Sequence, residues 1–421
     1  MSLPIYEGTI RLCIRLGRTE EAFEVAQRAN SRILFEAVSH LQQSSTTRCR
    51  GASLGNPSDR RFAEEHGVRS LDPQRALRHA HREILSATRA IQLLGERCLL
   101  QYFLSEDALV CCALSRRAGL VVRSTPLASK QAFDESVRRL VTDFTGRPQG
   151  TALLPKIRQA LREFYGILLG PVEDVFQETG GLVVVPAGPL WSIPVSCLFD
   201  GANYVAERHS VSYLPHVGLL TLPLLGRAPE SWVGFGNPGE DLKKVERELP
   251  RIAALFKHPM IYSGSEATRE NLWQALRQYG VVHVATRVFH DPEKPFDACF
   301  EVRGADGLTR EPCAEVINQD AKAALAILRC CHTGATVPWF GSEVAGVWAV
   351  FLLAGCRAIM ASPWKVYESE EVSRLFVRFY ELWVAEGKPP AEALALAQRE
   401  AIGGGAYPAV WGFPFLIGNL G

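Results

Sequence analysis

The sequence predicts an α/β fold with a mostly parallel sheet flanked by helices, preceded by a helical repeat-like region and a small α+β segment. From about residue 180 onward, continuous apolar runs alternate with longer helical patterns, as in sheets whose strands are buried on both faces. The strand-like runs are Leu182–Val185, Val281–Thr286, Ala324–Leu328 and Ala358–Met360. The helical patterns are Thr268–Arg277, Glu343–Ala354, Ser369–Ala385 and Ala391–Ala401.

Composition narrows the class of protein. The chain has 421 residues, of which 47% are hydrophobic and 22% charged, as in globular proteins of more than one domain. A net charge of +1 gives no general attraction to nucleic acid or anionic lipid. The longest uncharged apolar run, Ala345–Cys356, is too short to span a membrane, and the first residues lack a signal-peptide pattern. Eleven cysteines without CxxC spacing predict reduced thiols, a cytoplasmic location and no disulfide framework or metal site. No cofactor is expected.

Residues 1–45 predict a helical hairpin. The first helix closes at Leu16, Gly17 turns the chain, and Ala22 and Phe23 belong to the apolar stripe of the second helix. The pattern Leu-Gly-Arg-x-x-Glu-Ala-Phe resembles the core of a terminal tetratricopeptide repeat, and an unrelated helical hairpin is the alternative. Residues 46–73 are rich in Ser, Arg and Gly without apolar periodicity, which predicts a linker.

Residues 74–178 predict the α+β segment, and residues 179–421 the sheet domain. A helix near Pro73–Leu94 precedes three short strands and two further helices, the last bent at Pro171 because proline breaks the helical hydrogen bonds. The strands are Cys98–Phe103, Ala108–Leu114 and Leu120–Ser124, and the helices Lys130–Phe144 and Pro155–Phe176. Within the sheet domain, Thr268 is expected to cap its helix, and Ser342 and Glu343 to cap the helix that follows them.

Two strand-like runs end in reactive side chains, where active sites of open α/β sheets lie. One run leads to Cys330 and Cys331, and the other ends at Arg287. Cys331 is expected to be an accessible nucleophile at the strand end, with Cys330 pointing into the fold. The alternative for Cys331 is a buried structural cysteine.

In their order along the chain, a series of segments resembles the CHAT family of caspase-like cysteine peptidases. They are Leu182–Pro194, Val211–Pro215, Gly236–Pro238, Ala267–Arg269, Ala361–Val366 and Trp411–Phe413, closed by Gly418. The resemblance covers about residues 180–420 and weakens back to about residue 75, where it implies a pseudo-caspase-like segment. It implies a caspase-like peptidase fold whose N-terminal helices bind a protein substrate or a protein regulator. The family's usual motif Leu-Ser-Ala-Cys-x-Thr falls on Leu328–Thr333 and gives Cys331 the nucleophile position, with an oxyanion-binding role.

The base motif departs from the family pattern. CHAT domains usually carry His-x-Ala-Thr-His-Gly, where this chain has His283-Val-Ala-Thr-Arg287-Val288. Arg287 stands where the general base is expected and cannot accept the thiol proton, although its charge could favour a thiolate. Val288 keeps the N–H that serves the oxyanion in this family but adds a side chain. His290, just past the strand end, is the candidate substitute base, whereas His283 is expected in the core.

The resemblance leaves two functions open. One is a CHAT-type cysteine endopeptidase regulated through its N-terminal helices, and the other is an inactive pseudopeptidase that acts as a binding or scaffold module. In this family the loop after Ala361–Trp364 helps to form the pocket for the residue that precedes the cut. An apolar wall from Trp364 and a carboxylate from Glu368 would suit Arg or Lys. Two alternatives remain: the acidic residues lie in the first turn of the next helix, or Lys365 favours acidic substrates.

Overall fold

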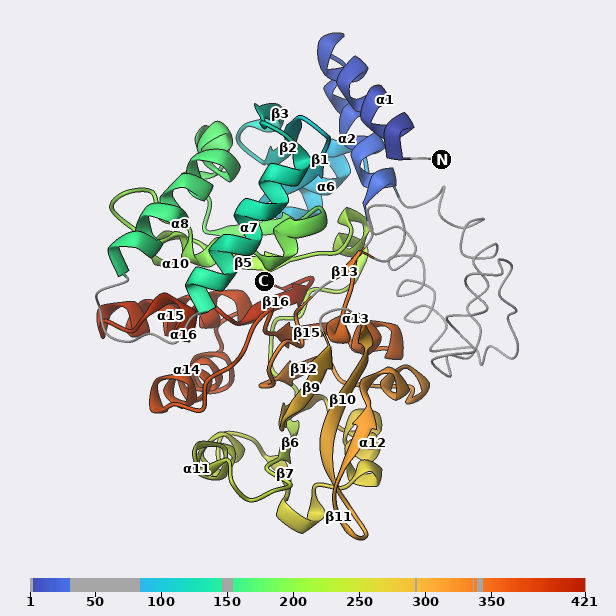
Figure 1. Ribbon diagram of the computed structural model, residues 1–421, viewed down its shortest axis with the longest axis vertical. Coiled ribbons are helices and arrows are strands. Elements are labelled where there is room, and N and C mark those ends of the chain that lie inside the picture. Colours follow the sequence, from blue (N-terminus) through green and yellow to red (C-terminus); the bar gives the residue numbers. More distant parts are fainter. Residues whose placement is uncertain are drawn as a thin grey trace.

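The computed structural model describes residues 3–30, 84–145, 154–291, 294–335, 337–338 and 344–420. One sheet of eleven strands forms the centre of this structure (Figure 1). From edge to edge the strands are β3 (Gly119–Pro126), β2 (Ala108–Ser115), β1 (Cys98–Leu104), β4 (Gly181–Val185), β5 (Ser210–Tyr213), β16 (Phe415–Gly418), β15 (Ala358–Ala361), β12 (Leu325–Leu328), β8 (Val281–Ala285), β6 (Ser231–Gly236) and β7 (His258–Ser263). Neighbouring strands run parallel except at β3–β2, β2–β1 and β16–β15. The predicted α/β fold with a mostly parallel sheet is therefore confirmed.

Helices cover both faces of this sheet, which explains why its central strands are apolar without alternation. They are α6 (Ala87–Leu94), α7 (Lys130–Thr145), α8 (Leu154–Leu168), α9 (Glu173–Phe176), α10 (Val205–Arg208), α11 (Lys243–Ala253), α12 (Arg269–Gln278), α13 (Val347–Ala354), α14 (Glu370–Tyr380), α15 (Pro390–Gly403) and α16 (Pro408–Trp411). Figure 1 shows α11, α14 and α15 on one side of the central strands and α12 and α13 on the other. Every residue of β8, β12 and β15 is accordingly buried.

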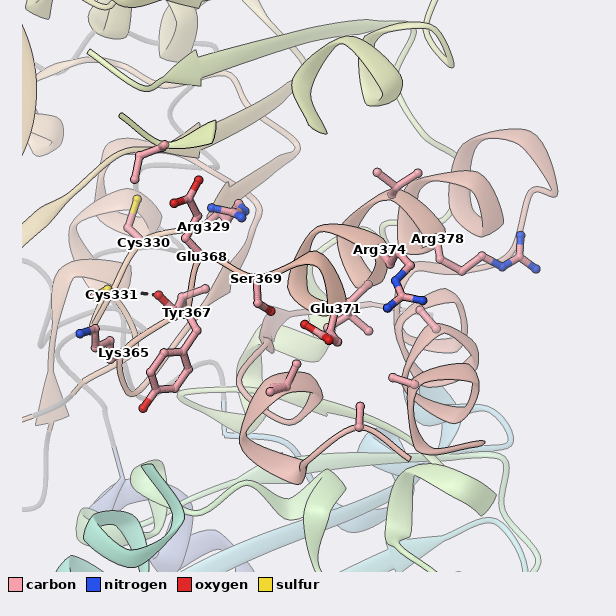
Figure 2. A pocket seen from close by; sticks show the side chains of 18 of the residues that line it. Arg329, Cys330, Cys331, Lys365, Tyr367, Glu368, Ser369, Glu371, Arg374 and Arg378 are labelled. Carbon is pink, nitrogen blue, oxygen red and sulfur yellow. Dashed lines mark hydrogen bonds between the residues drawn. The ribbon is translucent and has the colours of Figure 1, made fainter. Parts of the chain in front are cut away.

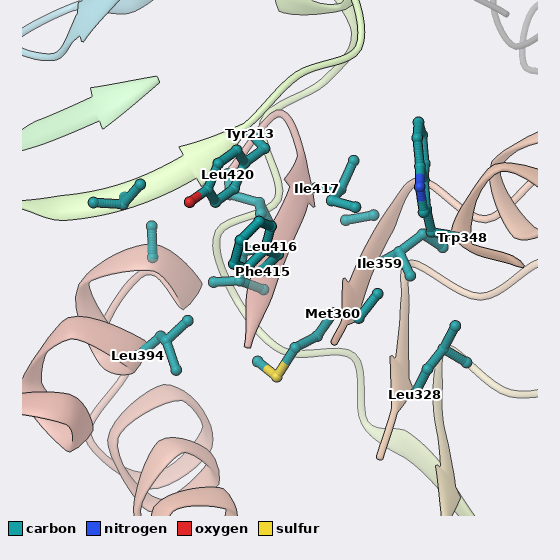
Figure 3. Packing of buried hydrophobic residues seen from close by; sticks show 14 of the residues in the cluster. Tyr213, Leu328, Trp348, Ile359, Met360, Leu394, Phe415, Leu416, Ile417 and Leu420 are labelled. Atoms are coloured by element: carbon teal, nitrogen blue, oxygen red, sulfur yellow. The ribbon is translucent and has the colours of Figure 1, made fainter. Parts of the chain in front are cut away.

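Strand β16 joins the two halves of the sheet. It pairs antiparallel with β15 on one side and parallel with β5 on the other, where Ile417 lies opposite Tyr213. The rings of Tyr213 and Phe415 stack with centroids 4.4 Å apart, inside a hydrophobic core that continues across both halves (Figure 3). Strands β1 and β4 lie on either side of the predicted boundary at residue 178 and pair in parallel, so sheet and core run across it.

The N-terminal residues form the predicted helical hairpin, with α1 (Leu3–Arg15) and α2 (Thr19–Ala29) joined at Gly17. Helix α2 is fixed to the rest of the molecule by buried polar contacts. The Gln27 side chain donates to the Leu85 carbonyl (2.8 Å) and accepts from its N–H (3.0 Å), and Asn30 donates to the Tyr102 carbonyl (2.8 Å). The remainder of the predicted hairpin and the linker over 46–73 lie outside the described residues.

Three predicted helices differ from the structure. Of the helix expected over Pro73–Leu94, residues 73–83 lie outside the described residues, residues 84–86 are not helical, and α6 begins at Ala87, where the Ser86 side chain caps it by accepting from the Arg89 N–H (3.2 Å). The helix expected over Pro155–Phe176 is not bent but broken, since α8 ends at Leu168 and Pro171 lies in a 3₁₀ turn before α9. The helix expected from Glu343 begins at Val347, directly after the short strand β14 (Val344–Ala345). Ser342 and Glu343 lie outside the described residues.

Helix caps elsewhere agree with the sequence. The Thr268 side chain accepts from the Asn271 N–H at the start of α12, as predicted. Ser369 caps α14 in the same manner by accepting from the Val372 N–H (3.3 Å). Helix α14 then continues as one π-helical turn over Glu381–Ala385, which completes the single helix predicted there.

A three-stranded antiparallel sheet follows β8 and was not predicted. Its strands are β9 (Val288–Asp291), β10 (Lys294–Gly304) and β11 (Gly307–Pro312). Strand β10 returns beside β9, so that the Glu301 N–H donates to the Arg287 carbonyl (2.9 Å). The Thr286 hydroxyl donates to the Glu301 carbonyl (2.7 Å) and closes the junction. This return places the Glu301 carboxylate beside Arg287, two residues after the end of β8. A second small pair, β13 (Val337–Pro338) and β14, follows the β12 end.

Candidate active site

The carboxyl ends of β8 and β12 open into a cleft of about 1290 Å³. The two strands pair in parallel with Val284 opposite Leu328, so the residues after them leave the sheet side by side. Arg287, Val288 and Cys331 all line this cleft. Figure 2 shows Cys331 and Lys365 at one end of it and Arg374 and Arg378 of α14 at the other. The structure thus brings together the two strand ends that the sequence marked.

Cys331 lies in a tightly fixed turn. It is half-buried, and its Sγ donates to the Val366 carbonyl at 3.7 Å. His332 follows with a φ of +57°, and its N–H donates to the Trp364 carbonyl (3.0 Å). Gly334 donates to the Ser362 carbonyl (2.6 Å), and a Cβ at this position would lie 2.8 Å from the Pro363 nitrogen. The turn therefore holds Cys331 against the segment that follows β15.

Cys330 points the other way, as expected from alternation along an extended chain. It is only 1% exposed, and its Sγ lies 3.3 Å from the Val284 carbonyl. Burial raises the pKa of the Cys330 thiol to about 12, which keeps it protonated at neutral pH. Both cysteines border the cleft, but burial and protonation of Cys330 leave Cys331 as the sulfur able to react with a molecule there.

Arg287 is held by two carboxylates. Its guanidinium forms an ion pair with Asp241, in the loop before α11, and its Nε lies 3.7 Å from Glu301 Oε2. Burial raises the pKa of Glu301 above its usual value, while Arg287 acts in the opposite direction. The Arg287 side chain is 46% exposed, and its guanidinium donates hydrogen bonds without accepting any. Arg287 therefore cannot take up a proton from Cys331.

The other candidate bases are placed as follows. His283 is completely buried, with Nδ1 3.2 Å from the Tyr380 hydroxyl, and is a core residue as predicted. Burial lowers the pKa of His283 below its usual value, with a smaller opposing contribution from Glu248. The backbone of His290 lies in β9, but its side chain is outside the described residues. Val288, the predicted oxyanion donor, begins β9 opposite Phe300 and packs against the core.

A buried charged cluster lies under the cleft, and no prediction from the sequence included it. Arg329 follows β12 directly, and its side chain is 4% exposed. Its Nε lies 3.0 Å from Glu248 Oε2 of α11, and the other oxygen of Glu248 lies 3.4 Å from His283 Nε2. The Ser373 hydroxyl of α14 donates to Glu248 (2.7 Å). The cluster thus connects α11 and α14 to the strand end that carries Cys331.

The sequence model of the CHAT domain matches residues 158–419, more than half of the chain. This chain belongs to the CHAT domain family. Among curated proteins, no significant match to the chain is found.

Three solved structures are similar to parts of this CHAT protein. Two are of the Saccharomyces cerevisiae separase–securin complex, both at 12% identity, with TM-scores of 0.41 and 0.42. They cover 92% and 94% of this chain, which spans only 27% and 28% of those chains. The third is the Arg-specific cysteine proteinase gingipain R, with 10% identity, a TM-score of 0.34 and coverage of 68% of this chain and 75% of the other.

Of the two predicted pocket residues of the CHAT domain, Trp364 lies outside the cleft and Glu368 lines it. Trp364 is 1% exposed and packs edge-on against Phe144 with centroids 5.0 Å apart, so it belongs to the core and not to the cleft wall. Glu368 does line the cleft, and its Oε1 accepts from the Lys244 backbone N–H at the start of α11 (2.6 Å). Glu368 precedes Ser369, the cap of α14, so it lies outside the first turn of that helix.

Two further observations concern ions and membranes. Within the part of the chain that the structure describes, no group of three or more His, Cys, Asp or Glu side chains could hold a metal ion. None of the described helices is both long enough and apolar enough to cross a membrane.

Proposed function

We propose that this CHAT domain binds an extended segment of another protein in the cleft over Cys331 and, as its sequence stands, does not hydrolyse it. The observation that carries this proposal is Arg287, paired with Asp241 and Glu301 at the position where the family has its base. The chain thus keeps the peptidase framework and the nucleophile position but acts as a binding module.

The shape of the cleft supports a peptide ligand. Its volume of about 1290 Å³ exceeds the ~300–1,000 Å³ of ordinary small-molecule pockets. It extends from Cys331 past α14 to Glu400 of α15, and its wall mixes charged side chains with apolar ones such as Val366 and Leu375. An elongated wall of this mixed kind suits several consecutive residues of an extended chain.

Hydrolysis of a peptide would need proton transfers that Arg287 cannot perform. The thiolate adds to the carbonyl carbon, and the C–N bond breaks only as the amine receives a proton. Water then hydrolyses the thioester, again with the help of a base, and regenerates the thiol. His283 cannot replace the base, because it is buried and four residues along a strand from Arg287 correspond to about 13 Å. We assign the N–H groups of Val288 and Cys331 as the oxyanion donors that would remain.

A reactivation experiment tests this proposal. The double change Arg287→His with Val288→Gly supplies a base next to Asp241 and Glu301, which would orient the imidazole as a carboxylate does in catalytic triads. We expect the unmodified chain to leave a peptide library intact and the double variant to cleave it at least about 10²-fold faster.

Two controls accompany the double variant. Cys331→Ala should abolish any cleavage that it gains, and Arg374→His, a change to another cleft arginine far from Cys331, should produce none. Cys331-dependent cleavage by the unmodified chain would contradict the proposal and would make His290 the first residue to test as the base.

A further inference from the structure

Arg329, the buried arginine next to the nucleophile position, takes no part in the chemistry described above. Arg329 stands two residues before Cys331, where the family motif usually has serine, and both side chains line the same cleft (Figure 2). Two residues of chain span at most about 7 Å, so a molecule held over Cys331 is within reach of Arg329.

The guanidinium of Arg329 is fixed but not saturated. Glu248 lies at ion-pair distance from Nε (3.0 Å), yet that N–H does not point along the line to the carboxylate. Nη2 is buried and has no acceptor among the described residues. Glu248 is meanwhile engaged by the Ser373 hydroxyl and lies close to His283. Both of these nitrogens are covered by protein, so the cation is held just beneath the cleft wall, where an anion in the cleft would stabilise its charge electrostatically.

We propose that Arg329 is the specificity-determining residue of the cleft and selects a bound segment with an Asp or Glu side chain next to Cys331. This inference rests on the proposed peptide-binding function. A guanidinium offers a planar set of donors that matches a carboxylate, and such charged pairs are stronger than neutral hydrogen bonds. Lys365 lines the same end of the cleft and makes no ion pair with the described residues, so it adds positive charge there.

Glu368 does not reverse this preference. Its carboxylate accepts the Lys244 N–H at the amino end of α11, and the Lys244 side chain itself pairs with Glu370 (3.0 Å). Glu368 thus supplies the acceptor that the first turn of α11 lacks from its own N-cap residue. The preference for Arg or Lys predicted from Glu368 is therefore replaced by a preference for acidic residues.

Tripeptide chloromethyl ketones that alkylate Cys331 test the proposal on the full chain. Three probes differ only in the residue next to the reactive group, which is Asp, Asn or Lys, and the rate of Cys331 modification is followed by mass spectrometry. We expect the Asp probe to react about tenfold or more faster than the Asn probe, with the Lys probe slowest.

Variants identify the residue responsible. Arg329→Met combined with Glu248→Gln removes both charges of the buried pair and should make the Asp and Asn rates equal. Arg329→Lys keeps the charge at this site and should retain a reduced preference for Asp. Arg374→Met, at the far end of the cleft, is the matched control and should leave the ratio unchanged.

The outcomes separate the two proposals. Equal Asp and Asn rates in the unmodified chain, or a faster Lys probe, overturn the role of Arg329 while peptide binding over Cys331 stands. An Asp preference that survives in the Arg329→Met, Glu248→Gln variant also overturns it. If no probe modifies Cys331 in the folded chain although iodoacetamide does, the peptide-binding cleft itself is refuted, and this inference with it.

Discussion

Cys330 and Cys331 are neighbours in the chain but lie in opposite environments. Cys330 is buried with a pKa of about 12, whereas Cys331 is half-buried on the wall of the cleft. Because only the thiolate is strongly nucleophilic, a buried thiol of this kind is inert at neutral pH. Cys356, also buried with a pKa of about 12, belongs to the same inert class.

Iodoacetamide at neutral pH should therefore modify Cys331 before Cys330 and Cys356. Tandem mass spectrometry of the peptide that contains Cys330 and Cys331 identifies the labelled sulfur, and Cys331→Ser provides the blank. Label on Cys330 or Cys356 in the native protein, with Cys331 untouched, would contradict the assignment of the nucleophile position.

His283 makes the stability of the protein depend on pH. Its pKa is lowered by burial, so folding favours the neutral imidazole. The stability that it contributes is fully present above the unfolded pKa of about 6.5 and is lost as the pH falls towards the folded pKa. The slope in that window is at most about 1.4 kcal/mol per pH unit for one proton.

Urea unfolding at several pH values between 5 and 8 measures this dependence. The free energy of unfolding should fall more steeply below pH ~6.5 in the unmodified chain than in His283→Gln, which cannot take up a proton in this range. Parallel curves for the two proteins would show that His283 is not the residue that titrates.

At the scale of single elements, α11 and the loop before it contact the site through three residues. Asp241 pairs with Arg287, Lys244 binds Glu368 and Glu370, and Glu248 pairs with Arg329. Glu248 is 1% exposed on the same apolar face as Leu249 and Ile252. One helix thus fixes the strand ends and the loop that together line the cleft.

Glu248→Gln should destabilise the protein strongly, because it leaves Arg329 buried without an anionic partner. Such losses amount to about 3–5 kcal/mol. Glu246→Gln on the exposed face of the same helix, where Glu246 pairs with Lys243, should change stability by less than about 1 kcal/mol. Urea unfolding of both variants measures the two losses of stability. Equal losses would show that the buried pair contributes no more to stability than the exposed pair.

The sequence predicted elements with strong periodicity and missed contacts between distant segments. Strands β1, β8 and β12 were located to within a residue or two, since apolar runs between turn residues mark buried strands. The carboxylates that hold Arg287 and Arg329 were not found, because ion pairs between separate elements leave no local pattern. One signal was available: Glu248 interrupts the apolar face of an amphipathic helix, and Arg329 interrupts an apolar strand end. Opposite charges at two such positions indicate a buried pair.

At the scale of the whole molecule, β16 is the strand on which both halves of the sheet depend. Gly418 within it has a φ of +138°, a conformation that side chains rarely adopt. A Cβ there would lie 2.8 Å from Ala358 Cβ and 3.0 Å from the Arg357 carbonyl oxygen on the neighbouring segment. The close pairing of β16 with β15 therefore requires glycine at this position.

Gly418→Ala should lower the free energy of unfolding by about 1–3 kcal/mol, the cost of a strained backbone conformation. Gly8→Ala in α1 is the matched control, because nothing lies within 4 Å of its added Cβ and alanine favours a helix by about 0.5–1 kcal/mol. Thermal unfolding of the two variants should shift in opposite directions, and a harmless Gly418→Ala would disprove the constraint.

The position of β16 also determines when the fold can close during translation. This strand is synthesised after the other ten, yet it lies between β5 and β15 in the middle of the sheet. Until Phe415–Gly418 leaves the ribosome, the nascent chain carries two partial sheets with unpaired edges, which are prone to aggregate. Protease digestion of ribosome-bound chains, stalled before and after this segment emerges, should show the change from cleavable to protected. The two partial sheets can therefore be joined, and their inner edges protected, only after all eleven strands of the sheet have been synthesised.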